Sequence, residues 1–127
     1  MNDDFLQFHK IITDRKSVFS VSGGRVTGRD EIKLFLKRLK KDRKYAQATH
    51  NTWAARISHN GQLWETKSDD GETGASATIL RVMQRAEAVN MIVVVTRWYG
   101  GIKLQGDRFR HFQDATKFFL EKISKKS

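Results

Sequence analysis

The chain contains no cysteine and no proline. Without cysteine it can form no disulfide framework, and it offers no thiolate as a nucleophile or as a metal ligand. Without proline, glycine and asparagine are the residues left to make strong turns. A chain without disulfides fits a reducing compartment, and we expect a cytoplasmic protein.

Long apolar runs are also missing. The longest is Met91–Val95, whereas a helix needs roughly 20 apolar residues to cross a bilayer, and the N-terminus has no apolar segment typical of a signal peptide. A chain of 127 residues can bury about two thirds of its unfolded surface in one domain. We therefore expect one soluble domain over residues 1–127 without membrane contact, in which residues 1–13 form an entry strand or a loose arm.

Negative charge is scarce beside positive charge. The 24 Lys and Arg residues against 14 Asp and Glu residues give a net charge of +10, which favours polyanionic partners such as nucleic acid or acidic protein surfaces. The excess is concentrated in residues 33–44, where Asp42 is the single acid. No acidic residue at helical spacing offsets these cations, so the segment predicts a surface that follows a phosphate backbone; the alternative is a solvated helix face. This basic patch consists of Lys33, Lys37, Arg38, Lys40, Lys41 and Lys44.

Hydrophobic periodicity predicts strands that alternate with helices. Alternation over Arg15–Val26 predicts a first strand, and Thr27 and Asp30 have the spacing of a capping box before an amphipathic helix. Asn60-Gly61 predicts a hairpin. The expected elements after that helix are strands over 48–57 and 62–67, a helix over 75–89, a strand over 90–96 and a last helix after Asp107.

The predicted order is β-α-β-β-α-β-α, which is typical of an α+β fold. We expect a two-layer sandwich in which a mixed sheet carries the helices on one face. The strand over 90–96 is nearly all apolar, which predicts a central strand covered on both faces.

Two stretches have residue types suited to a functional site. The acidic loop, Ser68–Gly74, holds Asp69, Asp70, Gly71 and Glu72 just before a predicted helix. Its carboxylates are ligands that Mg²⁺ accepts, or they complement the helix dipole, and its glycine amides are of the kind that holds a phosphate. The spacing matches neither an EF-hand nor a P-loop, so we expect no metal and no cofactor.

The second stretch is the exit stretch, Arg97–Lys103, at the end of the central strand. Its aromatic side chains can stack on a base or fill a protein pocket, and its cations can pair with phosphate or carboxylate. Alternatively, Arg97 pairs internally with the acidic loop and the aromatic rings cover the end of the sheet. The candidate binding residues here are Arg97, Trp98, Tyr99, Gly100, Gly101 and Lys103.

His50 is the histidine that best fits a catalytic role. With Asp69 or Asp70 it could form a base and its orienting group, but the chain offers neither a cysteine nor an elbow-type serine as nucleophile. We expect no catalytic residue and no enzyme. The alternative is a metal-dependent hydrolase that uses His50 with Asp69, Asp70 and Glu72.

Four motifs in this order resemble the Impact/YigZ family. They are Asp14-Arg15-Lys16-Ser17-x-Phe19, Ala48-Thr49-His50-Asn51, Asp69-Asp70-Gly71-Glu72 and the stretch from Val95 to Leu104. Residues 107–111, Asp-Arg-Phe-Arg-His, are similar to the eukaryotic Impact branch. The resemblance implies a fold like ribosomal protein S5 domain 2, with a left-handed βαβ connection.

The same resemblance implies a non-enzymatic role in translation. Impact-like proteins restrain the eIF2α kinase of the amino-acid starvation response by competing for its ribosome-associated activator. The upstream RWD domain of Impact and the downstream domain of YigZ are not expected within these residues, so we expect a stand-alone core or a fragment.

We predict a binding domain whose docking surface joins Asp69–Glu72 to Arg97–Lys103, with long-range attraction from the basic patch. The expected partner is a ribosome-associated regulatory protein or RNA. A general RNA- or ribosome-binding module is the alternative.

Overall fold

The computed structural model of the chain describes residues 4–124. In chain order its elements are β1 (Leu6–Asp14), β2 (Ser17–Arg25), α1 (Arg29–Lys40), α2 (Arg43–Ala46), β3 (His50–His59), β4 (Gln62–Ser68), α3 (Ala75–Arg85), β5 (Met91–Trp98) and α4 (Arg108–Ser124). This is the predicted order with two additions, the short helix α2 and the strand β1. The N-terminal region therefore forms an entry strand from Leu6 onward, and residues 1–3 of the expected arm lie outside the described part.

The five strands form one sheet in the order β1-β2-β5-β3-β4. Every neighbouring pair is antiparallel. The sheet is therefore purely antiparallel, and the expectation of a mixed sheet is wrong. The hairpin between β3 and β4 turns at Asn60 and Gly61, whose φ angles are 51° and 76°. Positive φ at both positions is what a two-residue type I′ turn requires, and the predicted hairpin is confirmed.

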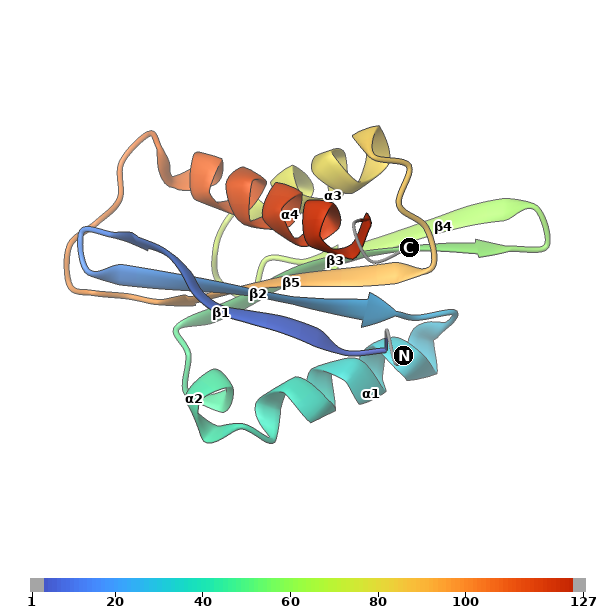
Figure 1. The fold of residues 1–127 in the computed structure, drawn as a ribbon, viewed down its shortest axis with the longest axis horizontal. Helices are drawn as coiled ribbons and strands as arrows, with labels where there is room; N and C mark the ends of the chain where they lie inside the picture. Colours follow the sequence, from blue (N-terminus) through green and yellow to red (C-terminus); the bar gives the residue numbers. More distant parts are fainter. Residues whose placement is uncertain (1–3, 125–127) are drawn as a thin grey trace.

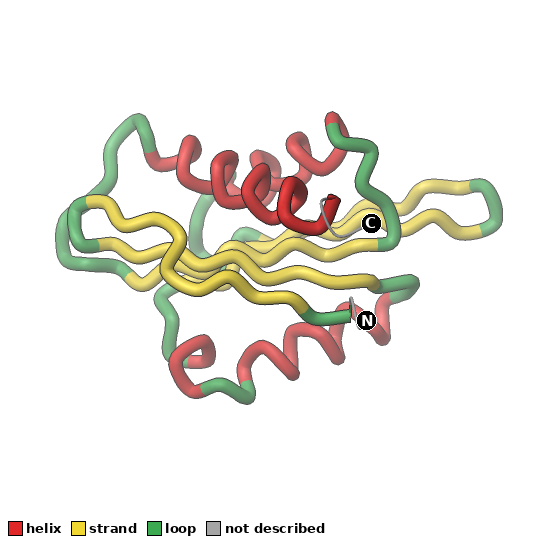
Figure 2. The backbone as a smooth tube through the Cα atoms, viewed as in Figure 1, coloured by secondary structure: helices red, strands yellow, loops and turns green. Residues whose placement is uncertain are grey.

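The helices lie on both faces of the sheet. Figures 1 and 2 show α3 and α4 on one side and α1 and α2 on the other. Alternate residues of β5 supply the two cores: Val93 and Val95 pack with α3 and α4, whereas Ile92 and Val94 pack with α1.

The α+β class and the double coverage of the central strand are confirmed. The expectation of helices on one face differs from the structure, because a strand that is apolar on both faces needs a cover on each.

The two crossover connections have opposite hands. β2 and β3 lie on either side of β5 and are both antiparallel to it, so β2 and β3 run in the same direction. For the same reason β4 and β5, which lie on either side of β3, run in the same direction. α1 joins β2 to β3 across one face, and α3 joins β4 to β5 across the other face in the opposite direction along the sheet (Figure 1). Relative to the first crossover, the second has the opposite strand direction, the opposite direction across the sheet and the opposite face. The first two reversals cancel, and the change of face then inverts the hand of the connection. One crossover is therefore left-handed, a rare connection that the resemblance to ribosomal protein S5 domain 2 implies.

The capping box of α1 is shifted by one residue from the prediction. The carboxylate of Glu31, and not that of Asp30, accepts hydrogen bonds from the amide and the hydroxyl of Thr27, at 2.6 and 2.8 Å. The reason is that Gly28 is the N-cap, which places Glu31 at the third helical position, where a side chain can reach back.

Candidate functional site

Glu72 is the centre of a buried group of charges at the end of β5. Its side chain is 2% exposed, and its carboxylate accepts hydrogen bonds from Nη1 of Arg97 at 2.9 and 3.1 Å and from Nη1 of Arg108 at 2.9 Å. Arg97 also donates to the hydroxyl of Ser17 on β2. The acidic loop and the exit stretch therefore meet, and the first turn of α4 joins them.

Asp69 and Asp70 hold the acidic loop in place. The carboxylate of Asp69 accepts from the amides of Gly74 and Ser76, at 2.9 and 3.0 Å, and from the Ser76 hydroxyl, which caps the start of α3. The Ser76 hydroxyl and the Gly74 amide hold the pKa of Asp69 below its usual value. Asp70 accepts from the amide of Asn51 at 2.7 Å. Both carboxylates thus stabilise the loop itself.

The exit stretch divides between the two faces of the sheet. Arg97 pairs in register with His50 and Phe19, and its guanidinium lies on the α3/α4 side with Glu72. Trp98, the next residue, points to the α1/α2 side, where its indole Nε1 donates to the carbonyl of Lys44 at 3.0 Å. Successive side chains of a strand point to opposite faces. Arg97 and Trp98 therefore belong to two separate surfaces.

A cavity of about 370 Å³ lies on the α3/α4 side, and we call it the Glu72 pocket. Arg97 and Arg108 line it, whereas Glu72, which pairs with both guanidiniums, is not among the lining residues. Tyr99, which is 45% exposed, and Lys103 complete the charged and aromatic part of the wall. The full lining is Thr49, His50, Arg97, Tyr99, Lys103, Leu104 and Arg108.

Two glycines of the predicted site allow close backbone approaches. Gly71 has a φ of 92°, and a Cβ on it would lie 2.6 Å from Cε1 of His50. A Cβ on Gly100 would overlap the backbone carbonyl of Lys16, so the exit stretch can cross the β1–β2 turn only with glycine there. Gly101 is exposed beside it.

On the opposite face, Trp98 belongs to an aromatic cluster with Tyr45 and His9. Its ring centroid lies 5.0 Å from that of Tyr45 and 5.8 Å from that of His9, in edge-on arrangements. His9 Nδ1 lies 2.8 Å from the Tyr45 hydroxyl. Burial, followed by the positive charges of Lys44 and Lys10, lowers the pKa of His9. Trp98 is therefore largely a packing residue, which agrees with the alternative that the rings cover the end of the sheet.

The basic patch is exposed along its whole length. The inner side chains of α1, Ile32, Phe35 and Leu39, pack on the sheet, which turns the lysines of the helix outward. The patch continues into α2, where the Lys44 carbonyl holds Trp98. It thus extends to the end of β5, on the face opposite the Glu72 pocket.

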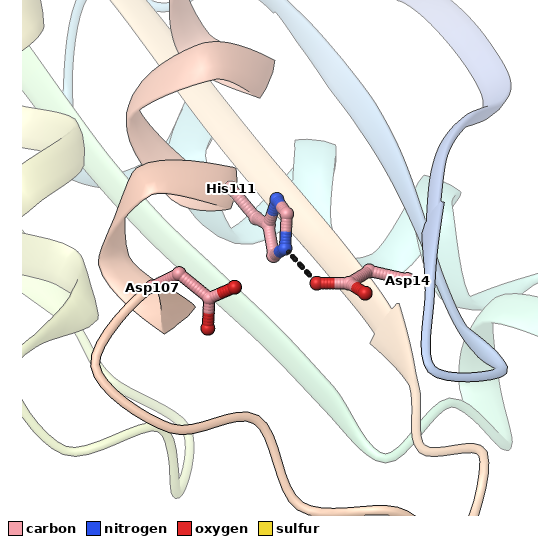
Figure 3. A group of neighbouring side chains, drawn as sticks. All are labelled: Asp14, Asp107 and His111. Carbon is pink, nitrogen blue, oxygen red and sulfur yellow. Dashed lines mark hydrogen bonds and ion pairs between the residues drawn. The ribbon is translucent and has the colours of Figure 1, made fainter.

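Asp14, Asp107 and His111 form the one group within the described residues that has metal-ligand geometry, with their ligand atoms within 4.8 Å of one another. Figure 3 shows them between the end of β1 and the start of α4. His111 Nε2 is 2.7 Å from Asp14 Oδ2, and Arg15 donates to both oxygens of Asp107, at 3.1 and 3.2 Å. The guanidinium already supplies the positive charge that the carboxylates require, so the group closes the β1–β2 turn onto α4.

The hydrogen bonds of His50 differ from those that the hydrolase alternative requires. Its Nδ1 donates to the backbone carbonyl of Asp70 at 2.6 Å, so the orienting group is a carbonyl and not a carboxylate. Its Nε2 faces Glu72 Oε2 at 3.9 Å. The hydroxyl of the adjacent Thr49 accepts from the amide of Tyr99.

Arg108 is the main site residue that the sequence analysis did not assign, together with Thr49 and Leu104 in the same wall. A signal was present, because a cation in the first turn of a helix is unfavourable next to the positive end of the helix dipole. An acidic partner offsets this cost, and Glu72 is that partner of Arg108.

The Impact N-terminal domain family matches residues 15–120. The chain belongs to this family. The resemblance found in the four motifs is confirmed, and the structure is that of an Impact domain. Within the described residues, no helix of this Impact domain is long and apolar enough to cross a membrane.

Relatives of this Impact domain are found in several animals. A Caenorhabditis elegans protein named Protein IMPACT homolog is 39% identical over 124 residues, which are 94% of this chain and 48% of the worm protein. Protein IMPACT of Mus musculus is 40% identical over 111 residues, 86% of this chain and 35% of the mouse protein. The chain therefore spans half or less of these relatives.

Two solved structures have a similar fold. One is that of Yih1, described as a two-domain translational regulator; it is 30% identical, with a TM-score of 0.57, and the match covers 94% of this chain and 45% of Yih1. The other is a hypothetical protein with a TM-score of 0.74 and 19% identity, covering 95% of this chain and 61% of that protein. The second likeness shows the fold alone.

Proposed function

We propose that this Impact domain acts in translational control as a binding domain and not as an enzyme. The observation that carries the proposal is the contrast between its charges: the acids of the acidic loop are engaged by the protein's own donors, whereas the basic patch is exposed and continuous. Exposed cations of one sign attract a polyanion over long distances. The likeness to Yih1, a translational regulator, supports the same role.

The finer proposal concerns the pathway and the partner. We infer that the domain acts in the cytoplasm, in the amino-acid starvation response that controls the eIF2α kinase. It does so by binding a ribosome-associated regulatory protein or RNA, with the basic patch providing attraction. The docking surface is the exposed part of the exit stretch and of the acidic loop, which includes Tyr99, Lys103 and Asp70, whereas Glu72 and Arg97 are buried behind it as a pair. Family membership and the net charge of +10 support this proposal.

A pair of matched charge variants tests the role of the basic patch. The triple variant Lys33→Gln/Lys37→Gln/Lys41→Gln removes three exposed cations from α1 and its C-cap. The control variant Arg85→Gln/Arg110→Gln/Lys117→Gln removes three exposed cations from α3 and α4. We expect ribosome co-sedimentation to fall in the first variant and to persist in the second. Equal losses in the two variants would show that only net charge matters and would contradict a specific patch.

Salt and nuclease separate RNA from protein as the partner. If the patch contacts RNA phosphates, each contact contributes about 0.7–0.9 to the slope of log affinity against log salt, so the α1 variant flattens the slope by about two to three. A flat salt response in the parent domain would exclude RNA. Partners that persist in a pull-down after nuclease treatment would identify a protein, and RNA binding by the isolated domain would favour a general RNA-binding module.

A further inference from the structure

The Glu72 pocket has a built arrangement of cations, which holds three segments of the chain together and also lines a cavity. Burying charges has a desolvation cost that apolar residues of similar size would avoid. Here a carboxylate that is 2% exposed holds one guanidinium that is itself buried, that of Arg97, and a second, that of Arg108, which is partly exposed. Both arginines line the cavity, and Glu72 is not among its lining residues. Glu72 thus holds the guanidiniums of two arginines that line a cavity of about 370 Å³.

The charge of the pocket is positive. Arg97, Arg108 and Lys103 contribute three positive charges against one negative charge from Glu72, so these four side chains together carry a net charge of +2. Lys103 makes no ion pair or hydrogen bond with any other described residue. An anion that enters the cavity therefore meets unneutralised charge within a concave wall, where electrostatic attraction is stronger than on an open surface.

Several hydrogen-bond donors in the wall are free to bind such an anion. Arg108 donates through Nη1 to Glu72 and through Nη2 to the Thr73 carbonyl, so its Nε and a second hydrogen on each terminal nitrogen remain. The Thr49 hydroxyl accepts from the Tyr99 amide, and its own hydrogen has no acceptor among the described residues. Charged and neutral donors on residues that line one cavity are typical of phosphate recognition.

The remaining wall consists of His50, Tyr99 and Leu104. Tyr99 is 45% exposed, and Arg97 lies 5.5 Å from its ring centroid. Leu104 is 8% exposed and anchors the loop after the exit stretch against the α3/α4 core. A tyrosine beside a set of cations suits a ligand with a flat ring and a phosphate, because bases stack on aromatic side chains with little sequence preference.

We propose that the Glu72 pocket binds a nucleotide, with the phosphate at Lys103, Arg108 and the Thr49 hydroxyl and the base against Tyr99. The nucleotide is either a free mononucleotide or one nucleotide of a single-stranded RNA, since both present the same phosphate and base. The inference rests on the proposed binding function of the exit stretch and names the chemistry of its ligand. The pocket lies on the face of the sheet opposite the basic patch. Nucleotide binding by the pocket and ribosome binding through the patch can therefore be tested separately.

An NMR titration tests the proposal with inorganic phosphate, adenosine monophosphate and a short single-stranded RNA as probes. Binding in the pocket shifts the backbone amides of Thr49, His50, Tyr99, Lys103 and Arg108. We expect the monophosphate to bind more tightly than inorganic phosphate, because only the former reaches Tyr99. An RNA that binds more tightly than the monophosphate identifies an RNA strand as the ligand, and the reverse order identifies a free nucleotide.

The matched variants are Lys103→Gln in the pocket and Lys117→Gln on α4, which are both exposed and lose the same charge. We expect Lys103→Gln to weaken monophosphate binding by at least about tenfold and Lys117→Gln to leave it unchanged. Equal melting temperatures show that both variants are folded. No amide shift with any probe, or equal affinities of the two variants, would overturn the inference. Loss of ribosome binding only in the α1 triple variant would then leave the proposed function in place.

Discussion

The two faces of the sheet differ in how they use charge at the end of β5. On the α3/α4 side, Glu72 and Arg97 are buried and paired, and their charges hold three segments of the chain together. On the α1/α2 side, the cations of the basic patch lie outside the core, which is made of apolar and aromatic side chains. Charge is therefore buried and paired at the centre of one face, beside the exposed Lys103 of the pocket, and lies wholly outside the core on the other face. The alternation of side chains along a strand explains why the end of β5 contributes to both faces: Arg97 points to one and Trp98 to the other.

The largest expected effect is on stability, from breaking the buried pair. Glu72→Gln leaves Arg97 buried without a counter-charge, which costs about 3–5 kcal/mol, because Arg97 is only 6% exposed. The measurement is the free energy of unfolding in urea.

The matched control for this variant is Asp107→Asn, which breaks the pair with Arg15 on the surface. Exposed pairs contribute far less than buried ones, because water screens their charges. If Glu72→Gln costs no more than Asp107→Asn, the buried group does not hold the acidic loop, and the contrast between the two faces is lost.

The next largest effect is a difference in stability between variants of two adjacent residues, Trp98 and Tyr99. Trp98→Ala removes packing against Tyr45 and His9 and a hydrogen bond to the Lys44 carbonyl, so we expect a loss of about 2 kcal/mol, below the value for a fully buried tryptophan. Tyr99→Ala, at an exposed site, changes stability by no more than about 0.5 kcal/mol. Thermal and urea unfolding measure both, and equal losses would show that the two rings share one environment.

The smallest effect is a dependence on pH at the start of α3. Ser76→Ala removes the hydroxyl that is the main cause of the lowered pKa of Asp69, so that pKa rises toward 3.8, the ordinary value. A lowered carboxylate pKa stabilises the fold above the unfolded pKa, and this contribution is lost as the pH falls through the folded pKa.

Near neutral pH we therefore expect Ser76→Ala to cost about 1 kcal/mol, and the difference from the parent to shrink in the acid range. The control is Ser58→Ala, at an exposed serine at the end of β3. Unfolding in urea at a series of pH values measures the difference. A cost of Ser76→Ala that is independent of pH would show that Asp69 is not the partner that matters.

Local patterns predicted most of the fold. Asn60 and Gly61 make the hairpin because these two residue types tolerate the positive φ angles that the turn requires. The apolar residues of β5 specified a strand with two covered faces. The helices on one face and the mixed sheet were not found, because topology depends on which segments pair across the chain, and periodicity carries no such information.

The candidate site was predicted in part. The contact between the acidic loop and Arg97 was among the interpretations of the sequence, and the structure brings these residues together. Trp98 was grouped with Arg97 and Tyr99, although the two-residue period of a strand already separates their side chains. Arg108 was not assigned, since its partner Glu72 lies 36 residues away.

The sequence by itself determined the period of each strand and helix, the position of the tight turn, the excess of positive charge and the motifs of the Impact domain, because these depend on residue types and short spacings. The tertiary structure decided which charges are buried and which remain exposed. Burial is a property of the packed layers and not of any single segment. Lys41 and Arg97 are both cations in the sequence, and only the fold pairs Arg97 with a buried carboxylate and leaves Lys41 in solvent.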